Sequence, residues 1–188
     1  MDWARHPEIR RIGRLIGQGE VIAYPTEAVW GLGCDPHSQA AVNKLLELKN
    51  RSVDKGLILV AASIEQLAPY LNDLSTKQRQ TLENSWPGPV TWLVPDNGRA
   101  PPWIRGDHPA VALRVSAHPI VVALCHACRG PIVSTSANVA GQPEARDASA
   151  VERQFGDRLA ALAPGEVGSA AKPTEIRDLL TGVVLRKA

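Results

Sequence analysis

Apolar residues along the chain follow two periods, one typical of helices and one of strands. Ile9, Ile12 and Ile16 recur at helical spacing, and Gly17 ends that segment. Ser38 is a candidate N-cap for a helix over 39–48, and Asp147 for a helix that ends at Phe155. Two capping-box patterns, at 63–66 and 75–78, predict two more helices, and a further helix is expected over 119–128.

Short apolar runs bounded by turn residues predict the strands. These runs are 21–24, 56–61, 90–94, 111–115, 132–133, 175–178 and 183–186. Segments punctuated by Pro and Gly are expected to be loops, and they are 23–33, 95–109 and 164–173. The last of these has the length and composition of a flap over a site.

Helices and strands alternate along the chain, but without a strict βαβ rhythm. This order predicts an α/β fold in which helices flank a twisted sheet of mixed parallel and antiparallel strands. A length of 188 residues suits one domain, and no repeat or linker divides the chain. We therefore expect a single domain over 1–188.

Composition excludes several classes of protein. With 44% hydrophobic and 21% charged residues, the chain has the make-up of an ordinary globular domain. A net charge of +2 is too small to argue for nucleic-acid binding by itself, although it is compatible with a local basic patch. The first residues lack an apolar signal core, and no apolar run is long enough to cross a bilayer. A cytoplasmic protein without a membrane partner is expected.

Cys125 and Cys128 form a lone C-x-x-C pair. A redox pair needs its first cysteine at a helix N-terminus, whereas Pro119 is expected to begin this helix well before Cys125. A zinc site needs two more ligands, and no second pair has matching spacing. We therefore expect buried thiols on one helix face, with no disulfide framework and no metal ligands from the protein.

Three cations lie where a predicted helix runs out into a loop, namely Lys49, Arg51 and Lys55. They can be solvated charges that complement the helix dipole. They can equally hold a polyanion such as a nucleotide triphosphate. Arg114 interrupts an otherwise apolar strand, and a buried Arg requires an anionic partner, either an internal carboxylate or a ligand.

Polar side chains also follow the predicted strand at 132–133. Ser134, Ser136 and Asn138 alternate, so in an extended segment they share one face. They can form a turn rich in side-chain-to-backbone bonds, or the polar edge at which open α/β sheets bind ligands. Thr26 follows another strand and could join the same crevice. The chain lacks a P-loop, a dinucleotide fingerprint and the common hydrolase motifs, so a nucleotide would bind without a widely shared motif.

Together, these segments resemble the YrdC-type threonylcarbamoyl-AMP synthases in their order along the chain and in their amino-acid residues. The matching segments are 24–27 with 31–35, Lys49-x-Arg51 with 55–57, 86–91, 113–115 with 118–119, 134–138 with Gly141, and 173–178. The resemblance runs from the first strand to Arg186 and is closest to the short, single-domain bacterial form. Ser52 replaces the usual Pro and is expected to loosen its loop, and Ala140 replaces the usual Ser and removes one hydroxyl.

The resemblance implies an activity. Members of this family make L-threonylcarbamoyladenylate from L-threonine, bicarbonate and ATP, and they release pyrophosphate. Other proteins then transfer the threonylcarbamoyl group to an adenine beside the anticodon of certain tRNAs. The family also implies a twisted mixed sheet with a concave, positively charged face.

The family pattern implies a role for each candidate residue. Lys49 and Arg51 would bind ATP phosphates and stabilise charge, with help from Arg186, and Ser136 and Asn138 would bond phosphate or ribose. The threonine or carbamate would be bound by Thr26, Lys55, Arg114, Ser134 and Thr174. Mg²⁺ would be held mainly by the ATP phosphates. No protein nucleophile is expected, because phosphoryl-type transfer depends on positioning and charge neutralisation.

Two other functions fit parts of the pattern. A cationic concave face could bind double-stranded RNA or tRNA through phosphates alone, without catalysis. With aromatic residues at only 4% of the chain, base stacking has little support. Carbamoyl transfer is the activity of a related domain in hydrogenase maturation proteins, but the acylphosphatase and zinc-finger modules that accompany that domain do not occur in this sequence.

Overall fold

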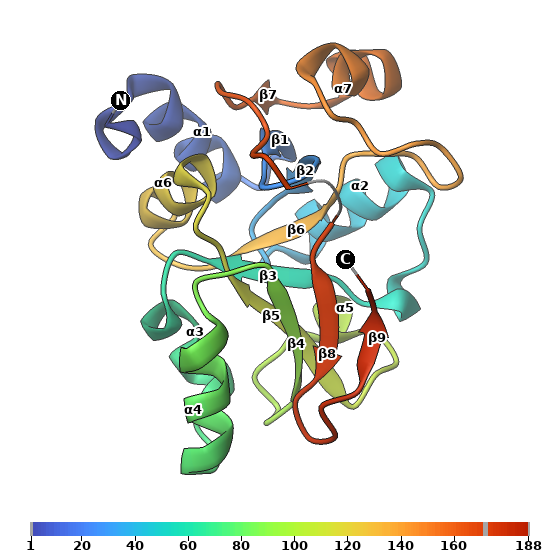
Figure 1. Cartoon of the computed structure of the whole chain (residues 1–188). Helices are drawn as coiled ribbons and strands as arrows, with labels where there is room; N and C mark the ends of the chain where they lie inside the picture. Colours follow the sequence, from blue (N-terminus) through green and yellow to red (C-terminus); the bar gives the residue numbers. More distant parts are fainter. Residues whose placement is uncertain (1, 171–172, 188) are drawn as a thin grey trace.

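A mixed sheet of nine strands runs through residues 2–170 and 173–187, which are the residues that the computed structural model describes (Figure 1). In spatial order the strands are β7 (Ala161–Leu162), β1 (Ile22–Pro25), β2 (Trp30–Gly33), β6 (Ile132–Ser136), β3 (Ile58–Ala61), β5 (Ala110–Val115), β4 (Val90–Pro95), β8 (Glu175–Asp178) and β9 (Val184–Arg186). The pairs β1–β7, β3–β5 and β4–β8 are parallel, and the other neighbours are antiparallel. The predicted mixed α/β sheet is confirmed.

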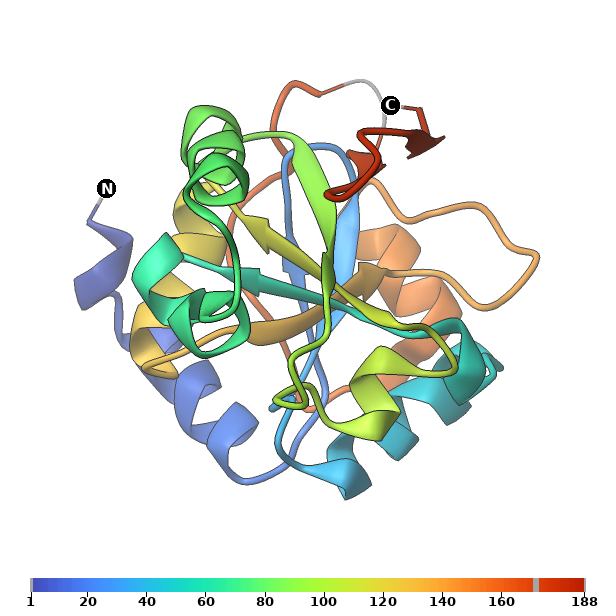
Figure 2. The same ribbon diagram turned by 90° about the horizontal axis from the view of Figure 1, so that it is seen from below.

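Helices cover both faces of this sheet (Figures 1 and 2). The α-helices are α1 (Pro7–Gly17), α2 (Gln39–Lys49), α3 (Ile64–Leu71), α4 (Thr76–Ser85), α5 (Pro102–Arg105), α6 (Pro119–Ala127) and α7 (Ala148–Phe155). Short 3₁₀ turns are η1 (Trp3–Arg5), η2 (Val53–Lys55) and η3 (Gly156–Arg158). Within the described residues, none of these helices combines the length and the apolar character needed to cross a bilayer.

The central strands are buried on both faces, and their alternating side chains feed two separate cores. In β1, Ile22 and Tyr24 join the core beneath α1 and α6, whereas Ala23 joins the core beneath α2, α5 and α7. In β3, Val60 faces the first core and Leu59 the second. Burial on both faces explains why these strands read as continuous apolar runs and not as alternating ones.

The segment 23–33 is not the loop that its Pro and Gly content predicted. Trp30–Gly33 forms β2, which pairs with β1 and β6. Its glycines are needed for close packing, because a Cβ on Gly33 would lie 2.7 Å from both the Tyr24 ring and the Val133 carbonyl oxygen. Glycine is a weak strand former, so this strand carries little local signal.

Other boundaries also differ from the prediction. The strand predicted at 132–133 continues to Ser136, and the loop predicted at 95–109 contains helix α5. The Ser75 capping box forms as predicted, but the Ser63 side chain makes no cap bond. Its partner Gln66 instead accepts a hydrogen bond from the Ala62 N–H and donates one to the carbonyl of Cys125. Strand β7 had no sequence signal.

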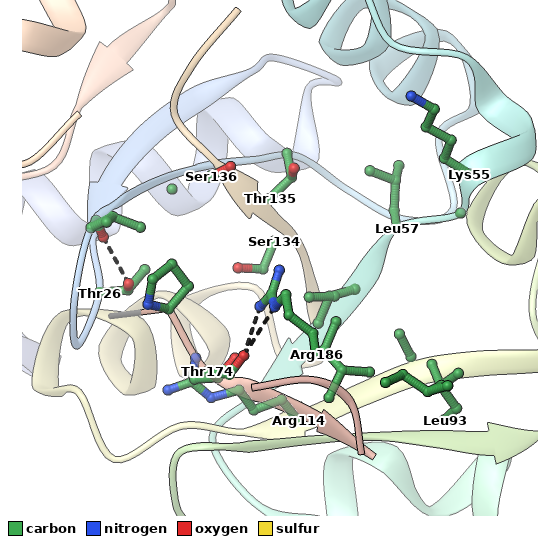
Figure 3. Close-up of a pocket in the computed structure, with 18 of the residues that line it drawn as sticks. Thr26, Lys55, Leu57, Leu93, Arg114, Ser134, Thr135, Ser136, Thr174 and Arg186 are labelled. Carbon is green, nitrogen blue, oxygen red and sulfur yellow. Dashed lines mark hydrogen bonds between the residues drawn. The ribbon is translucent and has the colours of Figure 1, made fainter. Parts of the chain in front are cut away.

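The C-terminal hairpin brings distant parts of the chain together. β8 pairs in parallel with β4, and β9 then returns along β8 as the edge strand (Figures 1 and 2). This arrangement brings Thr174 and Arg186 to the same cavity as the residues at the end of β6 (Figure 3). The ends of β2, β6, β8 and β9 therefore converge on one region.

Candidate active site

A cavity of about 380 Å³ lies where these strand ends converge (Figure 3). Its size is within the range of small-molecule sites. The predicted site residues that line it are Thr26, Arg51, Lys55, Arg114, Ser134, Ser136, Thr174 and Arg186. Lys49 and Asn138 are not in its wall.

The cavity has a polar end and an apolar end. Figure 3 shows Thr26 and Thr174 at one end, and Leu57 and Leu93 at the other. The apolar residues in the wall include Leu57, Ile58, Leu93, Ile104, Ala110, Ala112, Ile176 and Leu185. Sequence reasoning had assigned none of these to the site. A cavity of this kind suits a ligand with one charged or hydroxylated part and one flat or apolar part.

Strand β6 supplies hydroxyls to the middle of the cavity. Ser134 lies opposite Ile58 of β3, and Ser136 lies opposite Gly31 of β2. Thr135 also reaches the wall (Figure 3). The Ser136 hydroxyl donates to the Asn138 side-chain oxygen at 2.7 Å. A hydroxyl that donates inside the protein keeps its lone pairs for donors on a ligand.

The two threonines at the polar end are held by bonds within the protein. Thr26 Oγ1 donates to the carbonyl of Val29 at 2.7 Å, and the Thr174 and Thr91 hydroxyls lie 3.2 Å apart. The Thr174 carbonyl accepts from Arg186 Nη2 at 2.8 Å and from Arg186 Nε at 3.2 Å (Figure 3). This double contact fixes the guanidinium of Arg186 over the cavity.

Arg51 and Lys55 come from the segment between α2 and β3. Arg51 Nη2 donates to the carbonyl of Gly56 at 3.0 Å, and its Nε is buried without a hydrogen-bond partner in the described residues. Lys55 is exposed and lies across the cavity from Thr26 in Figure 3, so its predicted place with the threonine ligands stays a prediction. The Ser52 hydroxyl accepts from the Asp54 N–H and caps η2, and the loosening expected from Ser52 stays a prediction.

Lys49 is buried, with 4% of its surface exposed, and its ammonium group contacts protein acceptors. Nζ donates to the carbonyls of Ser136 and Asn138 and contacts the Asn138 side-chain oxygen at 3.3 Å. Burial, and next the charge of Arg51, lower the pKa of Lys49 to about 8. Lys49 thus connects the end of α2 to the end of β6, and its predicted contact with ATP stays a prediction.

Arg114 has the internal carboxylate that the sequence left open as one of its two partners. Arg114 Nη2 lies 2.6 Å from Glu27 Oε1, and Arg114 Nε donates to the Gly88 carbonyl at 3.3 Å. The same Glu27 oxygen accepts from the Ser116 hydroxyl at 2.6 Å. Burial raises the pKa of the Glu27 carboxyl, but the Arg114 charge and the Ser116 hydroxyl outweigh it and hold the pKa below its ordinary value.

His118 connects this pair to the segment that precedes β8. The backbone N–H of His118 donates to Ser116 Oγ at 3.0 Å, and the ring Nε2 lies 3.1 Å from the carbonyl oxygen of Glu166. Burial lowers the pKa of His118, so the ring is neutral at pH 7. The described part of the predicted flap, 164–170, is thus bonded to the body of the protein, and its closure over the site stays a prediction.

Sequence reasoning missed several polar residues of the site. Glu27, Ser116, His118, Glu144 and His108 lie in the wall or beside it. Glu27 and His118 belong to the segments that carry the family resemblance, so a role was open to them. Glu144 and His108 lie in loops whose local sequence shows no signal.

Ala140, which replaces a Ser, still donates its N–H to the Lys49 carbonyl at 2.8 Å.

Cys125 is buried on helix α6 as predicted, whereas Cys128 is half-buried and caps the end of that helix. Cys34, Cys125 and Cys128 are free thiols, and Cys125 donates to the Val60 carbonyl at 3.4 Å. Burial raises the pKa of Cys128 to about 11, so the reactive thiolate is scarce at pH 7. In the part of the chain that the structure describes, no three His, Cys, Asp or Glu residues are grouped as metal ligands.

Comparison with known proteins identifies the class of protein that this fold and cavity define. The model of the Sua5/YciO/YrdC family, described as telomere recombination, matches residues 14–188, and the chain belongs to this family. The resemblance seen in the sequence is thereby confirmed.

Individual proteins of known name or structure are similar to nearly the whole chain. A protein of Cellvibrio japonicus named threonylcarbamoyl-AMP synthase is 54% identical over 186 residues, covering 99% of this chain and 98% of the relative. The crystal structure of P. abyssi Sua5 complexed with L-threonine is 31% identical with a TM-score of 0.89, and the match covers 95% of this chain and 53% of that one. E. coli YciO, at 23% identity and a TM-score of 0.84 over 96% of this chain and 88% of that one, shares the fold.

Proposed function

We propose that this chain is an L-threonylcarbamoyladenylate synthase, which forms threonylcarbamoyl-AMP and pyrophosphate from L-threonine, bicarbonate and ATP. The observation that carries the proposal is the cavity itself. It places Arg51, Arg114 and Arg186 around the hydroxyls of β6 and joins this polar region to an apolar end. A relative that covers almost the whole chain has the corresponding name.

The two ends of the cavity suit the two organic substrates. Threonine fits the polar end, where Arg114 can pair with its carboxylate and Thr26, Ser134 and Thr174 surround it. The triphosphate would extend past Ser136 and the free edges of the arginines, and adenine would occupy the apolar end. Mg²⁺ would arrive with the triphosphate, because the described residues group no metal ligands of their own.

The chemistry needs positioning more than it needs a protein nucleophile. The threonine amine attacks the carbon of CO₂ and loses a proton, or attacks the carbon of bicarbonate, from which a C–O bond breaks and water leaves; either route forms a carbamate. A carbamate oxygen then attacks the α-phosphorus of ATP, the bond to the bridging oxygen breaks, and pyrophosphate leaves with the electron pair. Arginines beside the phosphates would neutralise the charge that develops, and an enclosed cavity would limit hydrolysis of the mixed anhydride.

The product would then pass to proteins that transfer the threonylcarbamoyl group to tRNA. ATP and tRNA occur together in the cytoplasm, so we place the reaction there. A function restricted to RNA binding has less support, because the cations lie around a cavity of small-molecule size and not along an extended groove.

A product assay tests the proposed function. Purified protein is incubated with ATP, Mg²⁺, threonine and bicarbonate, and pyrophosphate release is followed while the adenylate is identified by mass spectrometry. Release should require both threonine and bicarbonate, and omitting either should abolish it. Pyrophosphate release indifferent to threonine would contradict the proposal, and binding of double-stranded RNA without any turnover would favour the binding module.

A further inference from the structure

Glu27 has no role in the proposed chemistry, yet it lines the cavity and follows Thr26 of the polar end directly. Its side chain is 21% exposed and that of Arg114 only 10%, so the two charges face each other largely out of water. Glu27 Oε1 is the atom that meets both Arg114 Nη2 and the Ser116 hydroxyl, each at 2.6 Å. Glu27 Oε2 is buried and has no hydrogen-bond partner among the described residues. The negative charge of Glu27 is therefore balanced by Arg114.

This contact determines which edge of the Arg114 guanidinium is available to a ligand. Nε donates a hydrogen bond to the Gly88 carbonyl, and Nη2, which has no hydrogen-bond partner among the described residues, forms an ion pair with Glu27. Nη1 makes no hydrogen bond within the described residues, and Arg114 lines the cavity. Because a guanidinium is planar and rigid, fixing two of its nitrogens also fixes the third.

The backbone around Glu27 is held as firmly as its side chain. The Glu27 carbonyl accepts from the N–H of Ala170 at 3.0 Å, and the Thr26 carbonyl accepts from Gly168 at 2.9 Å. A Cβ on Gly168 would lie 2.8 Å from the Glu27 carbonyl oxygen, so this approach leaves no room for a side chain. Glu27 is thus anchored on both sides before a ligand enters.

We propose that Glu27 is a positioning residue for the amino-acid substrate. It holds the Arg114 guanidinium so that the free Nη1 edge meets the threonine carboxylate. Glu27 acts through Arg114 and not by touching threonine, because its own negative charge would repel the substrate carboxylate. This assignment rests on the proposed function, and it deepens that function by naming what orients the carboxylate-binding arginine.

The test is a kinetic comparison of Glu27→Gln with the wild type in the pyrophosphate assay. Glutamine keeps the size of the side chain and an acceptor for Ser116, but it removes the charge that holds Arg114. The KM for threonine should rise roughly 10- to 100-fold, the factor expected when a charge-assisted contact is lost. The kcat and the KM for ATP should stay within about twofold of the wild type, since positioning of threonine is a binding effect. Glu27→Asp keeps the charge at a shorter reach and should give an intermediate KM.

A matched control is Glu20→Gln. Glu20 pairs with Lys44 at the same N···O distance of 2.6 Å, but neither residue lines the cavity. Its threonine KM should equal that of the wild type.

The second measurement is a double-mutant cycle, in which Glu27→Gln is added to Arg114→Ala. If Glu27 acts through Arg114, then Glu27→Gln should not raise the threonine KM of Arg114→Ala any further. Arg114→Ala leaves a buried carboxylate unpaired, so adding Glu27→Gln should recover part of the melting temperature that Arg114→Ala loses.

The outcomes distinguish the positioning role of Glu27 from the proposed synthase function. If the wild type is active and Glu27→Gln has an unchanged KM for threonine, only the positioning role is overturned. A fall in kcat at constant KM, or an equal KM increase in the Arg114→Ala background, overturns it as well. If Glu27→Gln does not fold, the other two variants decide. A threonine KM equal to the wild type in Glu27→Asp, together with a raised threonine KM in Arg114→Ala, would contradict the positioning role of Glu27. A wild type without threonine-dependent pyrophosphate release overturns the proposed function and the positioning role with it.

Discussion

At the scale of single residues, the cations of this site differ more than their spacing suggests. Lys49 and Arg51 are neighbours in one motif, but Lys49 is buried against protein carbonyls and Arg51 lines the cavity. Helix α2 ends at Lys49, and the left-handed backbone of Asn50 changes the direction of the chain before Arg51. One cation is therefore bonded to the protein, while the other lines the cavity.

The buried position of Lys49 predicts a pH dependence of stability. Its pKa is about 8 in the folded protein against 10.5 when solvated. Between these values the unfolded chain binds one more proton than the folded chain, so the free energy of unfolding should rise with pH in this window and be flat below it. Relative to Lys49→Met, the wild type should gain on the order of 3 kcal/mol from pH 8 to pH 10.5.

Urea denaturation of both proteins across this pH range measures the effect. Any other group that titrates in this range is present in both proteins, so its contribution cancels in the difference. A constant difference between wild type and Lys49→Met would show that the three acceptors around Nζ keep Lys49 protonated throughout.

Arg51 should not be replaceable by lysine. Nη2 donates to the Gly56 carbonyl and Nε is buried, so the edge formed by Nη1 and Nη2 is the one that can meet phosphate with two parallel bonds. Lysine supplies only a point charge, so Arg51→Lys should lower kcat/KM for ATP roughly 10- to 100-fold, nearly as much as Arg51→Ala. Near-normal kinetics of Arg51→Lys, with unchanged far-UV circular dichroism, would instead assign Arg51 a general electrostatic role.

At the scale of elements, the segment 163–170 connects one edge of the sheet to the site. The N–H of Ala163 donates to the Ala23 carbonyl at 2.8 Å, and further along Gly168 and Ala170 donate to Thr26 and Glu27. A segment that looks like a loop in sequence thus borders the polar end of the cavity through backbone bonds. Its glycines matter because close backbone approach leaves no space for a Cβ.

Gly168→Ala tests this contact. The new Cβ would lie 2.8 Å from a backbone oxygen, so the segment must move away from Thr26 and Glu27. We expect a loss of about 1–3 kcal/mol in the free energy of unfolding, together with a higher KM for threonine and little change in kcat. Gly17→Ala, where no atom lies within 4 Å of the added Cβ, is the control and should be neutral or slightly stabilising. Wild-type kinetics of Gly168→Ala would show that the segment does not shape the amino-acid end.

At the scale of the whole molecule, the site is assembled from both halves of the chain. Thr26 comes from the first hairpin, the hydroxyls of β6 from the middle, and Thr174 and Arg186 from the C-terminal hairpin. β9 lies at the edge of the sheet and is exposed along its length, with Leu185 58% exposed. Its contribution is therefore to the cavity wall more than to the core.

A truncation after Thr181 should separate these contributions. Removal of the following residues deletes β9, Leu185 and Arg186 but leaves both cores intact. We expect cooperative thermal unfolding a few degrees below that of the wild type, and a KM for ATP raised by roughly tenfold through loss of a charged contact. Arg186→Ala in the full chain is the matched comparison and should reproduce most of the kinetic effect. An unchanged KM for ATP in both proteins would remove Arg186 from the nucleotide site.

Local sequence was sufficient for most elements and for the class of site. Helices with clear caps, such as those after Ser38 and Asp147, and buried apolar strands such as β3 and β5 have strong local signals. The segments shared with the family placed cations and hydroxyls in one site, because chemistry restricts which residue types hold a polyanion.

Only the tertiary structure decided which partner each of those residues has. Trp30–Gly33 is a strand because it pairs with β1 and β6, and Gly33 leaves the space that Tyr24 and Val133 occupy; no local rule contains these contacts. Lys49 bonds to residues that are 87 and 89 positions away, and Arg114 meets a glutamate from the first hairpin. Sequence thus determined which charges and hydroxyls are present, whereas burial and long-range pairing determined which of them line the cavity.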